Sequence, residues 1–131
     1  MAIFDTDFIV AILRGNDEAG RRYDFYAASG LQLRTTSITV MELLHGAHLH
    51  AQSIQKLQDV QKVLDCLEVI PFDTHAARQC ALIMAVNKQK KVEIGLPDLQ
   101  IGSCALAISD FIVTRNLKDF SRIPGLSIEK W

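Results

Sequence analysis

Hydrophobic and polar positions follow two periods along this chain, one typical of strands and one typical of helices. Short apolar runs predict strands at residues 2–4, 31–37, 69–72, 111–113 and 126–128. Apolar residues that recur every three or four positions predict helices at 8–13, 17–28, 38–48, 54–67 and 97–107, and another that Asp73 would cap. Strands and helices alternate, so the pattern predicts right-handed βαβ units. We therefore expect an α/β fold whose mainly parallel sheet of four or five strands carries helices on both faces.

The size and composition of the chain fit one folded unit. It has 131 residues and 14.6 kDa, and 49% of its residues are hydrophobic and 22% charged. A chain of this length buries roughly two-thirds of its unfolded surface as a single domain. No repeat, linker or low-complexity tract interrupts the sequence. We expect a single domain over residues 1–131.

Several functional classes are disfavoured by the same sequence. The longest apolar runs, residues 8–13 and 81–86, are much shorter than the roughly 18 residues of a membrane span. Asp5 and Asp7 stand where a secretion signal would carry lysines, so we expect a cytoplasmic protein without a membrane partner. A net charge of −1 argues against a general nucleic-acid-binding protein. The three cysteines are interpreted as reduced packing residues.

Four acidic residues fall where this fold would gather them. Asp5 ends the first expected strand, Glu42 begins the helix after the second, Asp98 begins a late helix, and Asp119 follows the strand at 111–113. The carboxyl ends of parallel strands share one edge of the sheet, so the four acids would meet there. Each acid also has an ordinary explanation as a helix-capping residue, and Thr39-x-x-Glu42 fits a capping box.

Convergence of four carboxylates would favour a metal site. Their charges would repel one another and raise their pKa values unless a cation neutralised them. Mg²⁺ and Mn²⁺ prefer oxygen ligands and suit a few carboxylates combined with substrate phosphate. Such ions activate water for attack on phosphorus, so the pattern points to phosphodiester hydrolysis.

Four short segments also resemble, in order, the signatures of the PIN-domain ribonucleases. They are residues 4–7 (FDTD), 37–43 (SITVMEL), 95–101 (GLPDLQI) and 113–120 (VTRNLKDF). The tail, residues 122–131, resembles the VapC toxins of bacterial and archaeal toxin-antitoxin pairs. This resemblance covers the whole chain. It implies a PIN-like three-layer α/β/α sandwich and a Mg²⁺- or Mn²⁺-dependent endoribonuclease, with RNA as substrate, a VapB-type antitoxin as partner and a homodimeric state.

The resemblance also implies roles for individual residues. The metal-binding and catalytic acids would be Asp5, Glu42, Asp98 and Asp119, with Thr6, Thr114 and Asn116 in supporting polar positions. The family usually has asparagine where this chain has Asp7, which would either join the acidic site or cap the first helix. Arg115 and Lys118 flank Asp119 and are candidates for holding RNA phosphate.

Two other functions remain open at this point. Residues 4–7 after a strand also resemble the nucleophile and acid pair of haloacid-dehalogenase-like phosphatases, although no convincing downstream lysine and paired aspartates follow. The third hypothesis is a non-catalytic PIN-like binding module whose acids only cap helices. A phosphoaspartate at Asp5 would favour the phosphatase, and absence of divalent-metal binding would favour the binding module.

Overall fold

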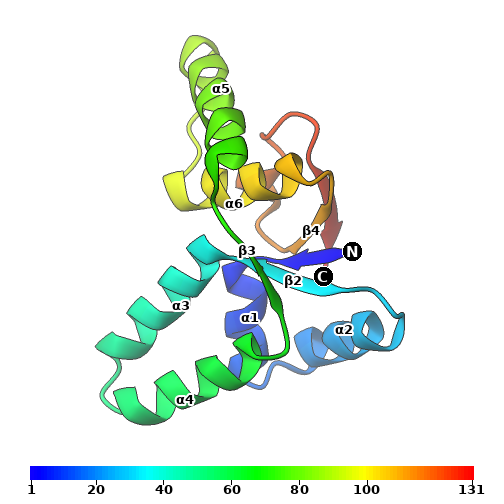
Figure 1. Cartoon of the computed structure of the whole chain (residues 1–131), viewed down its shortest axis with the longest axis vertical. Coiled ribbons are helices and arrows are strands. Elements are labelled where there is room, and N and C mark those ends of the chain that lie inside the picture. The colour runs from blue at the N-terminus through cyan, green and yellow to red at the C-terminus, as the bar shows by residue number, and fades with distance from the viewer.

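A five-stranded parallel sheet forms the middle layer of the fold, and helices cover both of its faces (Figure 1). The computed structural model describes residues 1–131. The strands are β1 (Ala2–Phe4), β2 (Leu33–Thr36), β3 (Glu68–Ile70), β4 (Phe111–Thr114) and β5 (Ser127–Lys130), in the order β3-β2-β1-β4-β5. Every neighbouring pair is parallel, which confirms the predicted three-layer α/β/α sandwich.

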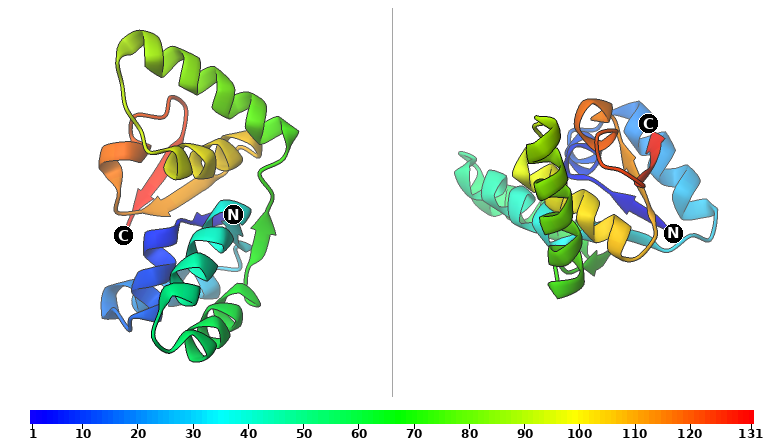
Figure 2. Two further views of the ribbon diagram at one scale, coloured as in Figure 1. Left: turned by 90° about the vertical axis from the view of Figure 1, so that its left-hand side faces the viewer. Right: turned by 90° about the horizontal axis from the view of Figure 1, so that it is seen from above.

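The helices divide between the two faces of the sheet. One group consists of α1 (Thr6–Leu13), α2 (Asp17–Ala28), α3 (Ser37–Leu49) and α4 (Ser53–Leu64). The other consists of α5 (Thr74–Lys90), α6 (Leu96–Ala107) and the short α7 (Leu117–Phe120). The two groups lie on opposite sides of the strands in Figure 2, and α5 projects beyond the rest of its layer in Figure 1. None of the helices combines the length and hydrophobicity needed to cross a membrane.

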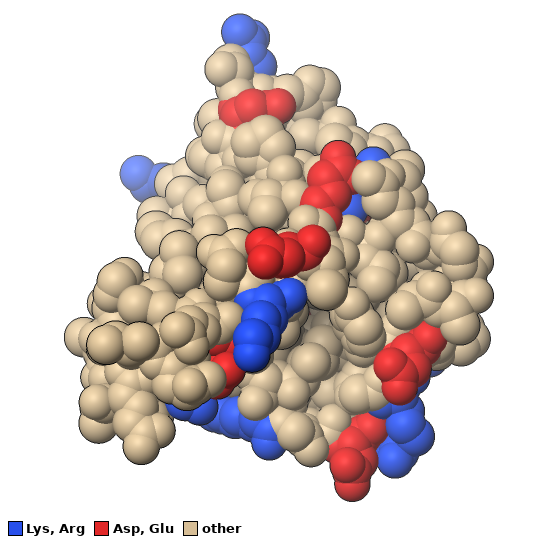
Figure 3. All heavy atoms as spheres, turned by 60° about the horizontal axis from the view of Figure 1, so that its bottom comes forward, with Lys and Arg blue, Asp and Glu red and all other residues tan.

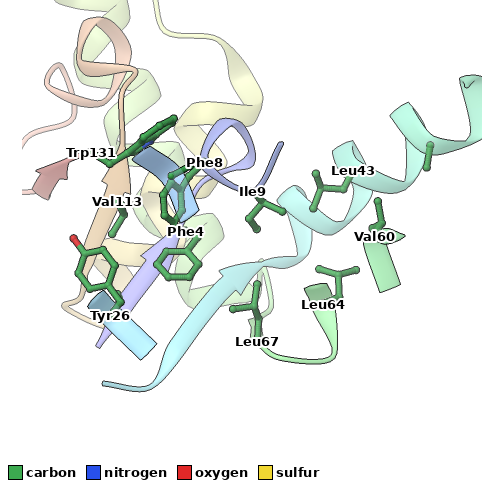
Figure 4. Close-up of a cluster of buried hydrophobic side chains, with 13 residues drawn as sticks. Phe4, Phe8, Ile9, Tyr26, Leu43, Val60, Leu64, Leu67, Val113 and Trp131 are labelled. Carbon is green, nitrogen blue, oxygen red and sulfur yellow. The ribbon is translucent and has the colours of Figure 1, made fainter. Parts of the chain in front are cut away.

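The strands supply side chains to both hydrophobic cores because consecutive residues point to opposite faces. Phe4 and Val113 face the layer of α1 to α4, where the Phe4 ring lies 4.7 Å from that of Phe8 (Figure 4). Ile112 faces the other layer and packs in a cluster with Ile101 and Phe120. All of these side chains are fully buried. Each contributes roughly 1.5–3 kcal/mol by leaving water, so the central strands are held from both sides.

Side-chain caps determine where the helices begin. Asp5 caps α1, Asn16 caps α2, Thr36 caps α3 and Asp73 caps α5, each by accepting a hydrogen bond from the amide three residues later. The predicted cap at Asp73 is confirmed. Asp7 is not a cap, because Asp5 occupies that position and Asp7 lies exposed in the first turn of α1.

The alternative explanation of Glu42 as part of a capping box in the third helix is wrong. The helix begins at Ser37 and Thr36 is its cap, so the Thr39 amide donates to Thr36 Oγ1 at 3.2 Å. Glu42 therefore lies in the second turn, beyond the free amides of the helix start. Its carboxylate is not used for capping and is available for another role.

The order of the strands reverses beside β1. From β1 the chain builds outward through β2 to β3, and then crosses to the other side of β1 for β4 and β5. In the register of the central pair, Ile3 lies opposite Ile112 and Phe4 opposite Val113. Parallel α/β sheets place their functional crevice at such a reversal, beyond the carboxyl ends of the strands. Here that position lies just after Phe4 and Thr114.

Some details differ from the sequence-based expectation. The second strand is shorter, at Leu33–Thr36, and the four-residue helix α7 was not expected. Cys80 and Cys104 are buried as expected, but Cys66 is exposed, so the interpretation of all three cysteines as packing residues is wrong for Cys66. It follows the end of α4, where its amide donates to the Val63 carbonyl at 3.1 Å in a turn that exposes the side chain.

Candidate active site at the carboxyl edge of the sheet

Asp5 lies at the centre of the reversal point, directly after β1. Its side chain is almost completely buried, with 2% of its surface exposed. One carboxylate oxygen accepts the Phe8 amide at 2.8 Å, and the other accepts the Thr114 hydroxyl at 2.5 Å. Burial raises the pKa of Asp5 to about 7, and the charges of Asp7 and Asp98 add to the rise, although the two hydrogen bonds oppose it.

One asparagine side chain bridges Asp98 and Asp119 by hydrogen bonds. The Nδ2 of Asn116 donates to Oδ2 of Asp98 at 3.0 Å and to Oδ2 of Asp119 at 3.2 Å. Pro97 and Asp98 occupy the first turn of α6, and Asn116 caps α7, so both helix starts aim polar groups at this edge. Burial, the neighbouring carboxyl of Asp119 and the charges of Glu42 and Asp7 together raise the pKa of Asp98 to about 6.

Glu42 is held at the same edge by hydroxyl groups. Thr6 Oγ1 donates to Oε1 of Glu42 at 2.7 Å and lies 3.1 Å from Oγ1 of Thr39. Thr39 is fully buried and in turn lies 3.3 Å from the hydroxyl of Thr36. Thr6 follows Asp5 directly, so this row of hydroxyls joins the start of α1 to the second turn of α3.

The acidic edge, defined as Asp5, Glu42, Asp98 and Asp119, has no basic partner. The ion pairs of the molecule involve Glu18, Glu68 and Asp110, and none of them includes an acid of this edge. No group of three or more carboxylate, histidine or cysteine side chains is close enough to enclose an ion. The edge is thus an open row of electrostatically coupled carboxylates and not a closed cage.

The donor set still fits a hard divalent cation. Mg²⁺ keeps several of its waters and usually binds through one or two protein carboxylates, so an open row is sufficient. All the available ligands are oxygens, which excludes a preference for soft thiophilic metals. None of the four acids forms an ion pair, so no basic side chain of the protein neutralises the negative charge gathered here.

The two candidate phosphate-binding residues differ in their surroundings. The guanidinium of Arg115 lies 3.7 Å from the centroid of the Trp131 ring, donates to the Trp131 carbonyl oxygen at 3.2 Å and pairs with Glu18. Lys118 is exposed and forms no ion pair. Acidic and basic side chains appear as separate groups on the face that Figure 3 shows, and neither sign forms a continuous patch. Lys118 is therefore the freer of the two groups.

Comparison with known proteins agrees with this arrangement. The model of the PIN domain family matches residues 2–126. The chain belongs to the PIN-domain family. Among curated proteins, the tRNA(fMet)-specific endonuclease VapC of Salmonella typhimurium is 38% identical over 96 residues, which cover 73% of each chain.

Two solved structures of toxin-antitoxin complexes resemble this PIN domain along its full length. The structure of VapBC2 from Rickettsia felis bound to a fragment of promoter DNA contains a chain with a TM-score of 0.92 and 27% identity, covering 99% of this chain and 98% of that one. DNA-bound VapBC from Salmonella typhimurium contains a chain with a TM-score of 0.90 and 31% identity, covering 99% and 97%. The resemblance in sequence thus extends to the fold.

The structure gives two threonines a role at the site that the sequence analysis did not assign to them. Thr36 and Thr39 are fully buried polar side chains that complete the row of hydroxyls behind Glu42. The sequence analysis named Thr39 only as part of a possible capping box and gave Thr36 no role. Threonine suits strands as well as valine does, so the pattern alone does not reveal that their hydroxyls are used.

Proposed function

We propose that this PIN-domain protein is a divalent-metal-dependent endoribonuclease of the VapC type and the toxin of a toxin-antitoxin pair. One observation carries the proposal: the buried carboxyl of Asp5 and the half-buried carboxyl of Asp98 meet at the strand-order reversal with no basic partner. The VapC names of the relatives support ribonuclease activity. None of the relatives described above is a phosphatase, and the exposed position of Asp7 gives no support to a buried nucleophile and acid pair.

We infer that Asp5, Glu42, Asp98 and Asp119 would hold the cation, Mg²⁺ or Mn²⁺. When bound at such a site, a divalent ion supplies activation of water and neutralisation of charge on the phosphate oxygens. The chain itself orients the ligands. Thr114 fixes one oxygen of Asp5, Asn116 holds Asp98 beside Asp119, and Thr6 holds Glu42.

The proposed partners follow from the relatives and from the chain's size. VapBC complexes among the structural neighbours support a VapB-type antitoxin as the inhibitory partner. We propose that residues 1–131 act as one domain, and that two copies form a homodimer measurable by sedimentation or light scattering. RNA is the substrate, and the initiator tRNA is the first species to examine because a relative is named for it.

Loss of the side-chain amide of Asn116 is expected to lower metal affinity or activity at the site while the fold stays intact. Asn116→Ala removes the donor that holds Asp98 and Asp119 together, and loss of such a supporting contact typically costs ten- to a hundred-fold in metal affinity or activity. The change is measured as the Mg²⁺ concentration that gives half-maximal RNA cleavage. The same substitution at Asn16, which caps α2 away from the edge, serves as control. Equal shifts in both variants would contradict a role for Asn116 at the site.

The activity itself is tested with purified, antitoxin-free protein and total RNA. Discrete fragments are expected with Mg²⁺ or Mn²⁺, none with EDTA, and none with the Asp98→Asn variant. No cleavage by folded protein that binds metal would overturn the nuclease and favour the phosphatase, which a phosphoaspartate at Asp5 would reveal. No metal binding at all would leave the non-catalytic binding module.

A further inference from the structure

A cavity of about 280 Å³ opens beside the acidic edge, between α1, α3 and α4. Its floor is apolar, with Val10, Leu13, Leu43, Ala47 and Val60 contributing to the lining. Glu42 forms part of its wall and also belongs to the acidic edge, so this residue is shared by the cavity and the edge. Its volume is close to the lower limit of about 300 Å³ for small-molecule sites, which suits a group the size of one nucleotide base.

Three basic side chains contribute to the lining of this cavity. Arg14, His50 and Lys56 line it, and Glu42 is its only acidic lining residue. Arg14 and Lys56 form no ion pair, although Lys56 is partly buried. Unpaired cations around an apolar hollow suit a ligand that carries both a flat apolar surface and a negative charge.

A glycine in the last turn of α3 leaves space at the wall of the cavity. Gly46 lines the cavity, and a Cβ atom added to it would meet no atom within 4 Å. Glycine inside a helix costs about 1 kcal/mol relative to alanine. Gly46 is exposed, and a larger side chain at this position would extend into the open space that borders the cavity.

We propose that this cavity is a nucleotide-binding subsite for the RNA strand that is cut at the acidic edge. A base adjoining the scissile phosphate packs on the apolar floor over Gly46, and Arg14 and Lys56 hold the phosphates that flank it. The inference rests on the proposed nuclease function, because a strand placed at Glu42 passes the opening of the cavity. The charge of the lining favours RNA over an apolar protein segment as the occupant.

Filling the cavity tests the proposal directly. Gly46→Leu is expected to weaken binding of short single-stranded RNA by at least tenfold and to slow cleavage to the same degree. Gly20→Leu is the matched control, because Gly20 lies in α2, also has open space around its Cα and does not line the cavity. Gly46→Ala shows that the helix tolerates a side chain. Circular dichroism and melting curves establish that all three variants fold.

Binding is measured in the Asp98→Asn background with EDTA, so that its result is separate from that of the cleavage test. The salt dependence of RNA affinity should lose about 0.7 in slope for each of Arg14→Gln and Lys56→Gln, the loss expected for one phosphate contact on a single strand. RNA that carries 4-thiouridine should crosslink to residues of α3 or α4 that line the cavity.

Two outcomes would overturn the subsite. Unchanged RNA affinity in Gly46→Leu, with unchanged salt slopes in the two charge variants, would mean that RNA does not enter the cavity. If the same Gly46→Leu variant lost affinity for a protein partner, the cavity would be a protein-docking groove. A wild-type protein that binds RNA in the cavity but cleaves none would retain the subsite and refute the nuclease.

Discussion

Asp5→Asn is expected to abolish RNA cleavage and, in the absence of metal, to make the folded protein more stable at pH 8. Asparagine has nearly the same shape as aspartate and can still accept the Phe8 amide as the cap of α1. It removes the buried negative charge that the Thr114 hydroxyl and the Phe8 amide only partly compensate. The residue would thus be retained for function at the expense of stability.

The experiment compares two aspartates that play the same structural role. Asp73 caps α5 as Asp5 caps α1, but it is exposed and lies outside the acidic edge. Asp5→Asn should lower the cleavage rate by more than about a hundred-fold, which is more than the loss typical of a merely supporting contact. Asp73→Asn should leave the rate unchanged. Comparable activity in the two variants would remove Asp5 from the proposed site.

The free energy of unfolding of the metal-free protein is expected to fall as the pH rises from about 4 to about 7. The pKa of Asp5 is about 7 in the fold, against an ordinary value of 3.8, so over this range the unfolded chain releases a proton that the folded chain retains. Stability therefore decreases with pH through the window and is flat above it, by on the order of 4 kcal/mol for a difference of this size. Asp98 contributes in the same direction, because its pKa is also raised, to about 6.

Urea unfolding in EDTA at several pH values between 4 and 8 measures this slope. Subtracting the profile of Asp5→Asn removes the titration of all other groups. Excess Mg²⁺ should restore stability at pH 8, by about 3 kcal/mol at a hundred times the dissociation constant, because it binds the folded state only. Parallel pH profiles for the wild type and Asp5→Asn would show that Asp5 is not held uncharged by burial.

The architecture could be predicted from the sequence because the features that determine it are local. Short apolar runs separated by amphipathic segments are what a parallel sheet with helices on both faces requires, and the cap at Asp73 follows from one side chain and one amide. Helix starts are less certain when several candidates stand together. At residues 36–39 three hydroxyl residues compete for the cap, and Thr36 holds it because it ends β2 in an extended conformation.

The acidic residues of the candidate site could be predicted from the sequence, but the contacts between them could not. Placing Asp5 and Asp98 at one edge needs only the direction of the strands. The contact of Asn116 with two acids, the placement of Arg115 against Trp131 and the hollow over Gly46 depend on packing between distant segments. The hydrophobic periodicity of the sequence carries no information about such contacts. A glycine in a helix is compatible with a close approach between two segments and also with open space beside the helix. The sequence alone does not distinguish these cases.

The pairing of β1 with β4 joins two segments that lie far apart in the sequence. Asp5 is synthesised 109 residues before Thr114, and Asn116 and Asp119 follow Thr114 in the chain. During synthesis the central strand has its β2 neighbour long before its β4 neighbour, and Asp5 stays without the hydroxyl that orients it. The acidic edge is therefore assembled only after the segment that carries Thr114, Asn116 and Asp119 has been synthesised. A cell that makes this protein is not exposed to active fragments of it while the chain is still growing.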